Sequence, residues 1–378
     1  MRYEAEIKAA AEKTDTAIYV IARNSGEGSD RSAGKGDYLL SDDEEANLKL
    51  LGQNFENVVV VLNVGGIIDT KFFSEINGLD SMLLMSQAGM TGGDALVEVL
   101  NGTVNPSGKL TDTWPVNFDD NPSSAGFANE DGNNAQELYN DDIFVGYRYY
   151  DTKQMKVAYP FGYGLSYTTF AYSNLQISNT TPTEKDTISI SVDVTNTGSV
   201  AGKEVVQLYV KDMTSSAIRP EKELKGFEKV QLTSGETKTV TMKLDKRSFA
   251  WYNTELHDWY AASGKYEILI GASSRDIRLS ETIELSSSQV IPMHVHMNTT
   301  LGELLRYPKT KETAKELTSK YLSAMNGGSE TASESAAEAI SEEMVEAMTD
   351  SMPLRSLCSF GGFSRTEIQE IIDKLQEI

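Results

Sequence analysis

The chain has 378 residues, of which 39% are hydrophobic, and its formal net charge at pH 7 is −22. The length suggests two or three domains, and the apolar content is sufficient for packed cores. The excess of acids argues against a nucleic-acid binder and against binding to anionic membrane surfaces, because both need an excess of Lys and Arg. A single cysteine, Cys358, excludes an internal disulfide framework and a multi-cysteine metal site.

Residues 1–172 alternate between strand and helix patterns. The predicted strands are short, continuous apolar runs, typical of strands buried on both faces: residues 17–22, 58–62 and 82–85. The predicted helices are residues 3–11, a segment that begins at the capping box of Ser41 and Glu44, and a segment after Gly93. This alternation predicts an α/β sandwich domain with a mostly parallel sheet.

Residues 173–288 follow a different pattern. Apolar and polar residues alternate strictly, most clearly in residues 188–194, 206–210 and 266–270. Turn signals such as Asn196-Thr197-Gly198 separate these runs. Short alternating strands with regular turns predict a β-sandwich.

Residues 289–378 predict a helical extension. Apolar spacing predicts helices near residues 301–305 and 317–322, and a capping box of Ser364 and Glu367 predicts a last helix. Residues 326–339 are rich in Gly, Ser, Glu and Ala, which predicts a flexible acidic linker. Much of the charge is local, because residues 111–147 and 321–354 together contain 15 acids and no base.

The loop after the first predicted strand is the first candidate site, because ligands bind beyond the carboxyl ends of strands in open parallel sheets. Glu27 lies between Gly26 and Gly28, where the backbone can approach a ligand and the carboxylate can project. From the pattern alone, an ordinary surface turn explains these residues better. A phosphate-binding loop is excluded, because neither of its glycine spacings is present.

The remaining reactive side chains indicate no second site. His294 and His296 flank Val295 without a visible third ligand, so a polar linker strand is the better interpretation. His257 is predicted to be a turn or surface residue, and Cys358 has no base placed to activate it. We therefore expect neither a metal ion nor a cofactor.

Aromatic residues and glycines are dense in residues 144–150 and 159–167, after the first acidic stretch. Aromatic faces near carboxylates suit sugar recognition, because sugar C–H faces pack on rings and hydroxyls donate to carboxylates. The alternative is that these tyrosines pack the first domain against the β-sandwich. The pattern slightly favours this packing interpretation.

Several short motifs follow one another over roughly the first 285 residues: Ser25-Gly26-Glu27-Gly28 with Asp30-Arg31, Gly36-Asp37-Tyr38-Leu39-Leu40-Ser41, Val59-Val60-Val61-Leu62-Asn63-Val64-Gly65, Asn105-Pro106-Ser107-Gly108-Lys109-Leu110, Val145-Gly146-Tyr147-Arg148-Tyr149-Tyr150-Asp151, Phe161-Gly162-Tyr163-Gly164-Leu165-Ser166-Tyr167, and Ala201-Gly202-Lys203-Glu204-Val205. In this order and spacing they resemble the C-terminal half of glycoside hydrolase family 3 enzymes of the β-glucosidase kind.

The resemblance implies an α/β sandwich followed by a fibronectin type III-like domain, and retaining hydrolysis of β-linked glycosides. It implies that Glu27 is the general acid/base, with Asp30 and Arg31 as candidate substrate-binding residues. In such enzymes the nucleophilic aspartate lies on a separate (β/α) barrel. A retaining glycosidase needs both carboxylates, about 5–5.5 Å apart.

The sequence departs from the family pattern, because we find no barrel, no nucleophile motif and no first strand ahead of the first helix. We therefore expect the isolated chain to be inactive and a separate barrel chain to be its partner. The alternative is a non-catalytic carbohydrate-binding or interaction module left by truncation. A split enzyme, a truncated gene product and a cloned fragment stay open, as does the sugar. We expect a cytoplasmic location, with secretion left open.

Overall fold

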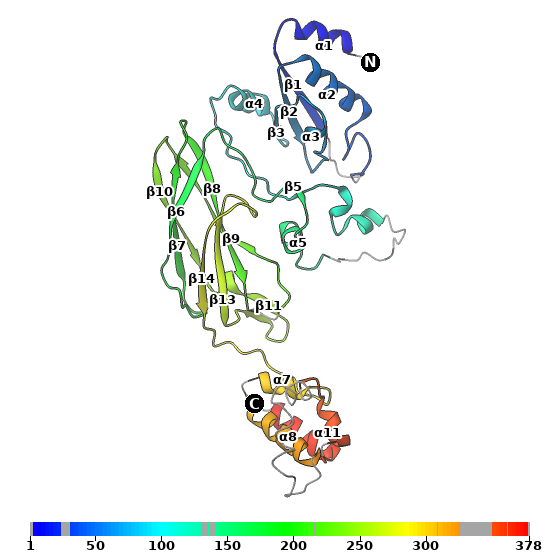
Figure 1. Ribbon diagram of the computed structural model, residues 1–378, viewed down its shortest axis with the longest axis vertical. Coiled ribbons are helices and arrows are strands. Elements are labelled where there is room, and N and C mark those ends of the chain that lie inside the picture. The colour runs from blue at the N-terminus through cyan, green and yellow to red at the C-terminus, as the bar shows by residue number, and fades with distance from the viewer. Residues whose placement is uncertain are drawn as a thin grey trace, which may run out of the picture. The chain divides into compact units, whose positions relative to one another are not determined.

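The computed structural model describes residues 3–23, 31–129, 135, 139, 141–214, 217–307, 309–325, 350–360 and 362–376. The chain divides into two compact units (Figure 1). Unit 1 comprises Met1–Tyr252 and Trp259–Gln289, and unit 2 comprises Asn253–Asp258 and Val290–Ile378. Glu27, Asp30 and the linker predicted at residues 326–339 lie outside the described residues.

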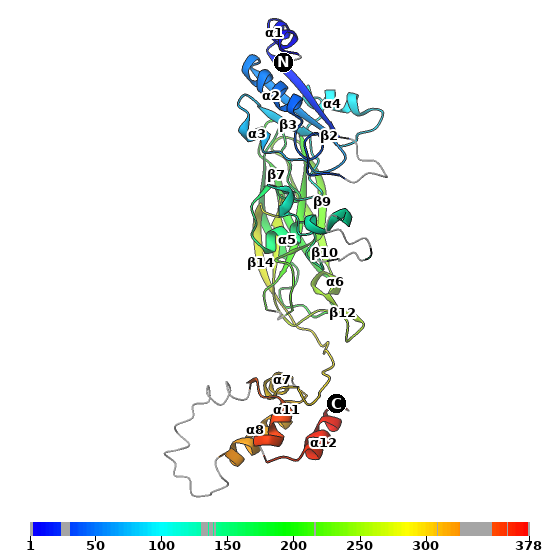
Figure 2. The ribbon, with the colours of Figure 1, turned by 90° about the vertical axis from the view of Figure 1, so that its right-hand side faces the viewer.

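Unit 1 begins with a parallel sheet between helices, as predicted. The strands lie in the order β1-β2-β3: β1 (Thr16–Arg23), β2 (Asn57–Val64) and β3 (Ser81–Leu84). The helices are α1 (Glu4–Ala11), α2 (Asp42–Asn54), α3 (Phe72–Glu75) and α4 (Gly92–Leu100). Figure 2 shows α2 and α4 on opposite sides of the sheet. The predicted capping box starts α2, because Ser41 Oγ accepts from the Glu44 amide at 3.2 Å.

One face of this sheet forms a core with α2 and α3. Its buried members include Ile21 on β1, Leu48 on α2, Val60 and Leu62 on β2, and Phe72 on α3. Every second residue of β1 and β2 points to this face, since side chains alternate along a strand.

The opposite face of β1 is open. Ile18 is 53% exposed and Val20 is 50% exposed. The prediction that residues 17–22 are buried on both faces was therefore wrong for β1. The physical reason is its place at the edge of the sheet, where only β2 is its neighbour in the described part of the chain.

A connecting region follows the sheet and leads to the β-sandwich. It contains β4 (Trp114–Pro115), the 3₁₀ turns η1 (Phe118–Asp120) and η2 (Ser124–Asn129), α5 (Tyr147–Thr152) and β5 (Val157–Tyr159). Strands β4 and β5 pair antiparallel, and the Trp114 ring is buried in the core of the parallel sheet.

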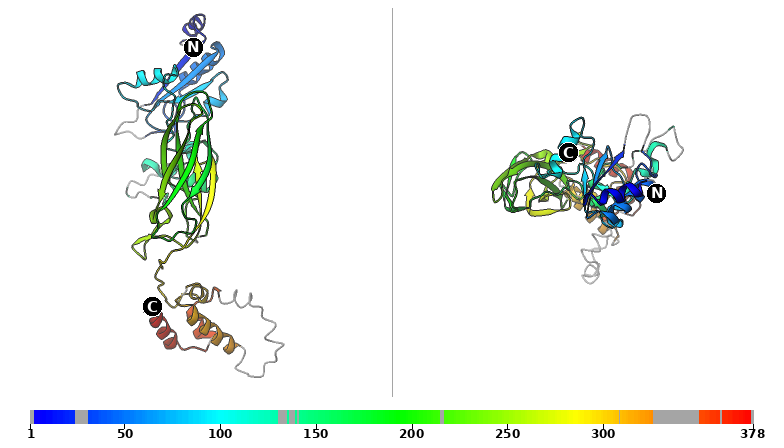
Figure 3. Two further views of the ribbon diagram at one scale, coloured as in Figure 1. Left: turned by 90° about the vertical axis from the view of Figure 1, so that its left-hand side faces the viewer. Right: turned by 90° about the horizontal axis from the view of Figure 1, so that it is seen from above.

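The rest of unit 1 is the predicted β-sandwich of antiparallel sheets (Figure 3). One sheet has the order β10-β7-β6: β6 (Phe170–Ile177), β7 (Ile188–Asn196) and β10 (Thr237–Leu244). The other has the order β14-β13-β8-β9: β8 (Gly202–Asp212), β9 (Glu223–Leu232), β13 (Gly264–Gly271) and β14 (Ile277–Leu285). Shorter elements are α6 (Lys246–Phe249), β11 (Trp251–Asn253) and β12 (Asp258–Tyr260). The predicted alternation is confirmed on β7, where Ile188, Ile190, Val192 and Val194 are all buried.

Unit 2 is helical. Its helices are α7 (Leu301–Arg306), α8 (Lys311–Met325), α11 (Leu354–Phe360) and α12 (Arg365–Gln376). They share one core, which includes Leu301, Leu317, Leu354 and Ile368. The predicted capping box is confirmed, because Ser364 and Glu367 exchange side-chain and backbone hydrogen bonds at the start of α12.

The segment around Val295 was predicted to be a linker strand, and this prediction was wrong. Residues 290–296 are irregular, and Val295 is fully buried in the core of unit 2. Burial of this side chain needs the chain to follow the helical core, which a regular strand cannot do here. None of the helices within the described ranges combines the length and the apolar character needed to cross a bilayer.

Candidate functional site

The candidate loop begins where β1 ends, at the buried side chain of Arg23. Its guanidinium binds the carboxylate of Glu44 with two hydrogen bonds, at 2.7 and 2.8 Å. Its Nε donates to the carbonyl of Asp37 at 2.7 Å. Two parallel bonds between Arg and a carboxylate fix geometry as well as adding energy. Arg23 therefore ties the carboxyl end of β1 to the start of α2 and to the far side of the loop.

Glu44 serves two partners at this junction. Besides Arg23, its Oε2 accepts from the Ser41 amide at 2.8 Å, completing the capping box. Burial works to raise the pKa of the Glu44 carboxyl, but the hydrogen bonds and charge of Arg23 outweigh it and hold that pKa below its ordinary value. The pair is therefore ionised in the folded protein at neutral pH.

Arg31 stands at the other end of the loop. Its Nε forms an ion pair with Asp37, and its Nη2 donates to the Ile67 carbonyl at 3.3 Å. Asp37 also accepts from the Ser32 amide at 2.6 Å. Burial works to raise the pKa of Asp37, and the Ser32 amide and Arg31 hold it below its ordinary value. These bonds give Arg31 an anchoring function, while its predicted contact with substrate stays a prediction.

An acidic and aromatic cluster lies beside this anchor. The Tyr38 ring is buried and meets the Phe118 ring edge-on at 5.3 Å. Burial, together with the charges of Asp69 and Asp120, raises the pKa of Tyr38 to about 12. Burial also raises the pKa of Asp69, which follows β2. The carboxyl ends of β1 and β2 thus lead into a partly buried, electronegative environment.

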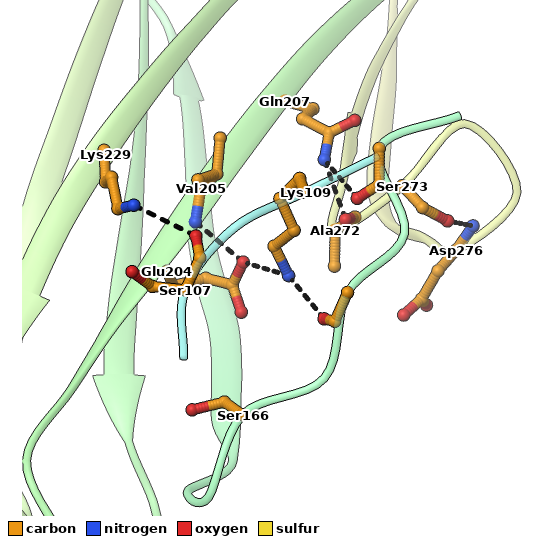
Figure 4. A network of polar contacts seen from close by, with 12 residues as sticks. Ser107, Lys109, Ser166, Glu204, Val205, Gln207, Lys229, Ala272, Ser273 and Asp276 are labelled. Carbon is orange, nitrogen blue, oxygen red and sulfur yellow. Dashed lines mark hydrogen bonds and ion pairs between the residues drawn. The ribbon is translucent and has the colours of Figure 1, made fainter. Parts of the chain in front are cut away.

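A second polar network joins the α/β part of unit 1 to the β-sandwich (Figure 4). Lys109 Nζ lies 3.0 Å from Glu204 Oε1 on β8 and donates to the Gly164 carbonyl at 2.8 Å. Gln207 donates to the carbonyls of Gly162 and Ala272, at 3.1 and 2.8 Å. The segments around residues 105–110 and 160–167 are therefore bound to each other and to β8.

Two glycines allow this close approach. A Cβ atom at residue 164 would lie 2.3 Å from the Gly108 carbonyl oxygen, and one at residue 162 would lie 2.1 Å from Oε1 of Gln207. Gly162 also has a φ of 78°, in the left-handed region that favours glycine. The Gly-x-Gly spacing of this motif is thus explained by packing against the sandwich.

A buried carboxylate strengthens the same junction from α5. Asp151 Oδ1 accepts from Arg275 Nε at 2.7 Å, and its Oδ2 lies 3.0 Å from Lys222 Nζ. The carboxylate is 3% exposed, so these two cations compensate for the cost of its burial.

The aromatic segments support the packing interpretation. The Tyr147 ring stacks on Phe161 at 4.7 Å and meets Tyr209 of β8 edge-on at 6.0 Å. The hydroxyl of Tyr147 accepts a hydrogen bond from the Leu224 amide at 2.7 Å. These rings fill the space between α5 and the sandwich, so they are not free for a sugar.

The histidines agree with the structural interpretation. His257 is an exposed turn residue with a φ of 49°, as predicted. His294 lies 3.2 Å from Glu255, and both side chains are largely exposed. His296 accepts from the Asn298 amide at 3.1 Å. Within the described residues, no group of three or more His, Cys, Asp or Glu side chains is arranged to hold a metal ion.

Comparison with known proteins identifies the family. Residues 2–167 match the glycosyl hydrolase family 3 C-terminal domain, and residues 204–274 match the fibronectin type III-like domain. The chain belongs to glycosyl hydrolase family 3. It is 38% identical to thermostable beta-glucosidase B of Acetivibrio thermocellus over 378 residues, which is 99% of this chain and 48% of that relative.

A solved structure supports the same fold for this family 3 chain. The GH3 beta-glucosidase of Bifidobacterium adolescentis shares 33% sequence identity with a TM-score of 0.73, over 82% of this chain and 45% of that one. Not every relative is named a glucosidase. An exo-alpha-(1->6)-L-arabinopyranosidase of Bifidobacterium breve is 44% identical over 232 residues, covering 61% of this chain and 29% of that relative. The chain spans about half the length, or less, of these relatives.

Sequence reasoning found the loop but missed its supports. Arg23 and Glu44 were not recognised as an anchor, although Glu44 was recognised as part of a cap. The signal was present as an arginine at the end of a predicted strand and a glutamate at the start of the next helix. Lys109 and Glu204 were visible only as members of motifs, with nothing in the sequence to pair them.

Proposed function

We propose that this chain is the C-terminal part of a retaining β-glycosidase and that Glu27 is its general acid/base. The observation that carries the proposal is the anchored loop at the carboxyl end of β1. Arg23 and Arg31 hold its two ends, through Glu44 and Asp37. A loop clamped in this way can present a carboxylate at a fixed position, which general acid catalysis needs.

The chemistry assigned to Glu27 requires a raised pKa. A general acid must be protonated near the working pH, and neighbouring negative charge or burial raises a carboxyl pKa. Asp69 and Tyr38 supply a partly buried, electronegative environment at the ends of the neighbouring strands. In the first step Glu27 donates its proton to the departing glycosidic oxygen while a carboxylate nucleophile attacks the anomeric carbon. In the second step Glu27 takes a proton from water, which attacks the same carbon and releases the nucleophile.

The nucleophile is proposed to reside on a (β/α) barrel, either in the same polypeptide or in a partner chain. The substrate is proposed to be a β-linked glycoside, since relatives covering the whole matched region are named β-glucosidases. The isolated chain is proposed to be inactive, because retaining hydrolysis needs both carboxylates. The proposed division is residues 1–172, 173–288 and 289–378, with β6 beginning at Phe170 and β14 ending at Leu285.

A chimeric enzyme tests this proposal. The part of the Acetivibrio thermocellus relative that precedes its matched region is fused ahead of this chain. Hydrolysis of p-nitrophenyl β-glucoside is then measured for the chimera and for the isolated chain. We expect activity only in the chimera, and a loss of about 10²–10⁴-fold in Glu27→Ala. Azide should restore turnover in that variant by replacing water as the second nucleophile.

The matched control is Glu75→Ala, which removes an exposed carboxylate at the end of α3. It should leave the rate unchanged. An active chimera whose rate survives Glu27→Ala contradicts the role of Glu27. An inactive chimera that binds saccharides in calorimetry favours the alternative, a non-catalytic carbohydrate-binding module.

A further inference from the structure

The outer edge of β1 carries no strand partner in the described part of the chain. β1 pairs in parallel with β2 along Thr16–Arg23, and the sheet order ends at β1. Proteins commonly protect such edges with proline, lysine or a bulge. The eight residues of β1 contain neither proline nor lysine, and their pairing with β2 runs without a shift in register. The edge is therefore long, regular and able to accept another strand.

The face of the sheet beside this edge is apolar and open. Ile18 and Val20 are each about half exposed, and the next residue on that face, Ala22, is also exposed. Helix α2 covers the opposite face through Leu48, and α1 lies next to α2. A strand added at the edge of β1 would thus bring its own apolar side chains against Ile18 and Val20.

Charge distinguishes this region from the rest of the chain. The sequence of residues 1–23 contains four bases and four acids, so it is neutral within a chain of net charge −22. Two copies of so acidic a protein repel each other over most surfaces. The neutral, apolar edge of β1 is a surface at which two copies can approach without that penalty.

We infer that β1 pairs with β1 of a second copy of this chain, antiparallel about a two-fold axis. Two-fold contacts between identical surfaces are the commonest way for soluble chains to associate. Because side chains alternate, only registers that pair residues of equal parity keep the apolar faces together. An axis through Tyr19 places Ile18 against Val20 of the second copy. It continues each three-stranded sheet into one of six strands.

This pairing closes the assembly at two copies. It uses the long edge of each sheet, and the other edge is β3, with only four residues, Ser81–Leu84. Eight residues per copy bury less than the roughly 800 Å² per partner of a standard stable interface. The dimer should therefore be weak, with a dissociation constant in the micromolar range.

Sedimentation of the full chain at concentrations from about 1 µM to about 200 µM tests the inference. The wild-type chain should change from monomer to dimer over this range. Ile18→Lys and Val20→Lys should each raise the dissociation constant about tenfold or more, because two charges would meet across the axis. The control Val97→Lys changes an apolar residue of α4 that is 58% exposed, and should leave the equilibrium unaltered.

Hydrogen exchange provides a readout that does not depend on any variant. Backbone amides of β1 should exchange more slowly at high than at low protein concentration, while those of β3 should not change. A chain that stays monomeric over the whole range overturns the inference and assigns the edge to a different occupant. A dimer that survives both lysine variants, with no concentration-dependent protection of β1, overturns it as well.

Discussion

The buried ion pair between Lys109 and Glu204 should be one of the largest single contributions to the junction between the α/β part and the sandwich. Lys109 is 13% exposed and Glu204 is 7% exposed. Replacing Lys109 by Met leaves the Glu204 carboxylate with the Val205 amide, at 2.7 Å, as its remaining hydrogen-bond donor in the described structure. Loss of one partner of a buried pair costs about 3–5 kcal/mol, because the other charge stays buried without compensation.

Since Lys109 also donates to the Gly164 carbonyl, its loss breaks a contact between two segments as well. We therefore expect Lys109→Met to lower the free energy of unfolding of unit 1 by about 3 kcal/mol. All three tryptophans, Trp114, Trp251 and Trp259, belong to unit 1. Urea denaturation followed by tryptophan fluorescence thus reports on unit 1 alone.

A double-mutant cycle isolates the pair. Glu204→Gln should cost a similar amount, and combining it with Lys109→Met should cost much less than the sum of the two. As a control, Lys8→Met breaks the exposed pair with Glu4 on α1 and should leave the midpoint unchanged. Single variants that cost less than about 1 kcal/mol, with additive effects in the double variant, would refute the reasoning.

Three further predictions concern the loop anchor and the motif glycines. Arg23→Met should lower the free energy of unfolding by about 3 kcal/mol, because it leaves Glu44 half-buried without its cation, whereas Lys49→Met, which breaks an exposed pair with Glu45, should have no effect on the urea midpoint. Gly164→Ala should cost about 2 kcal/mol or more, because its Cβ would collide with the Gly108 backbone; a cost near zero would show that the segment can move aside. The folded-state pKa of Glu44 lies below its ordinary value of 4.5, so its contribution to stability is present above that pH and is lost as the pH falls through the folded-state pKa. Urea midpoints measured from about pH 6 to about pH 3 should fall less steeply for Glu44→Gln than for the wild-type chain, and parallel curves would contradict this.

The elements that could be predicted are those specified by local sequence. Capping boxes at Ser41 and Ser364 start helices in the structure as predicted, because cap and partner are three residues apart. The strand alternation of β7 was equally local. The exposure of Ile18 could not be predicted, since an apolar run does not show whether a neighbouring strand or helix is present to cover it.

Long-range pairings escaped prediction for a similar reason. Lys109 and Glu204 are 95 positions apart, and no periodicity connects them. The same holds for Asp151 and Arg275. For the candidate site, the glycines around Glu27 located the loop, but the anchor formed by Arg23 and Glu44 depends on how α2 packs beside β1.

The role of Glu27 is tested most directly by varying the leaving group in the chimeric enzyme. A general acid matters most when the departing alcohol is a poor leaving group, because the proton it supplies then stabilises the developing alkoxide. We predict that Glu27→Ala lowers kcat/KM about 10²–10⁴-fold for an alkyl β-glucoside and far less for 2,4-dinitrophenyl β-glucoside, whose phenolate leaves without protonation. Equal losses on both substrates, or none on either, would contradict the assignment of Glu27 as the acid/base.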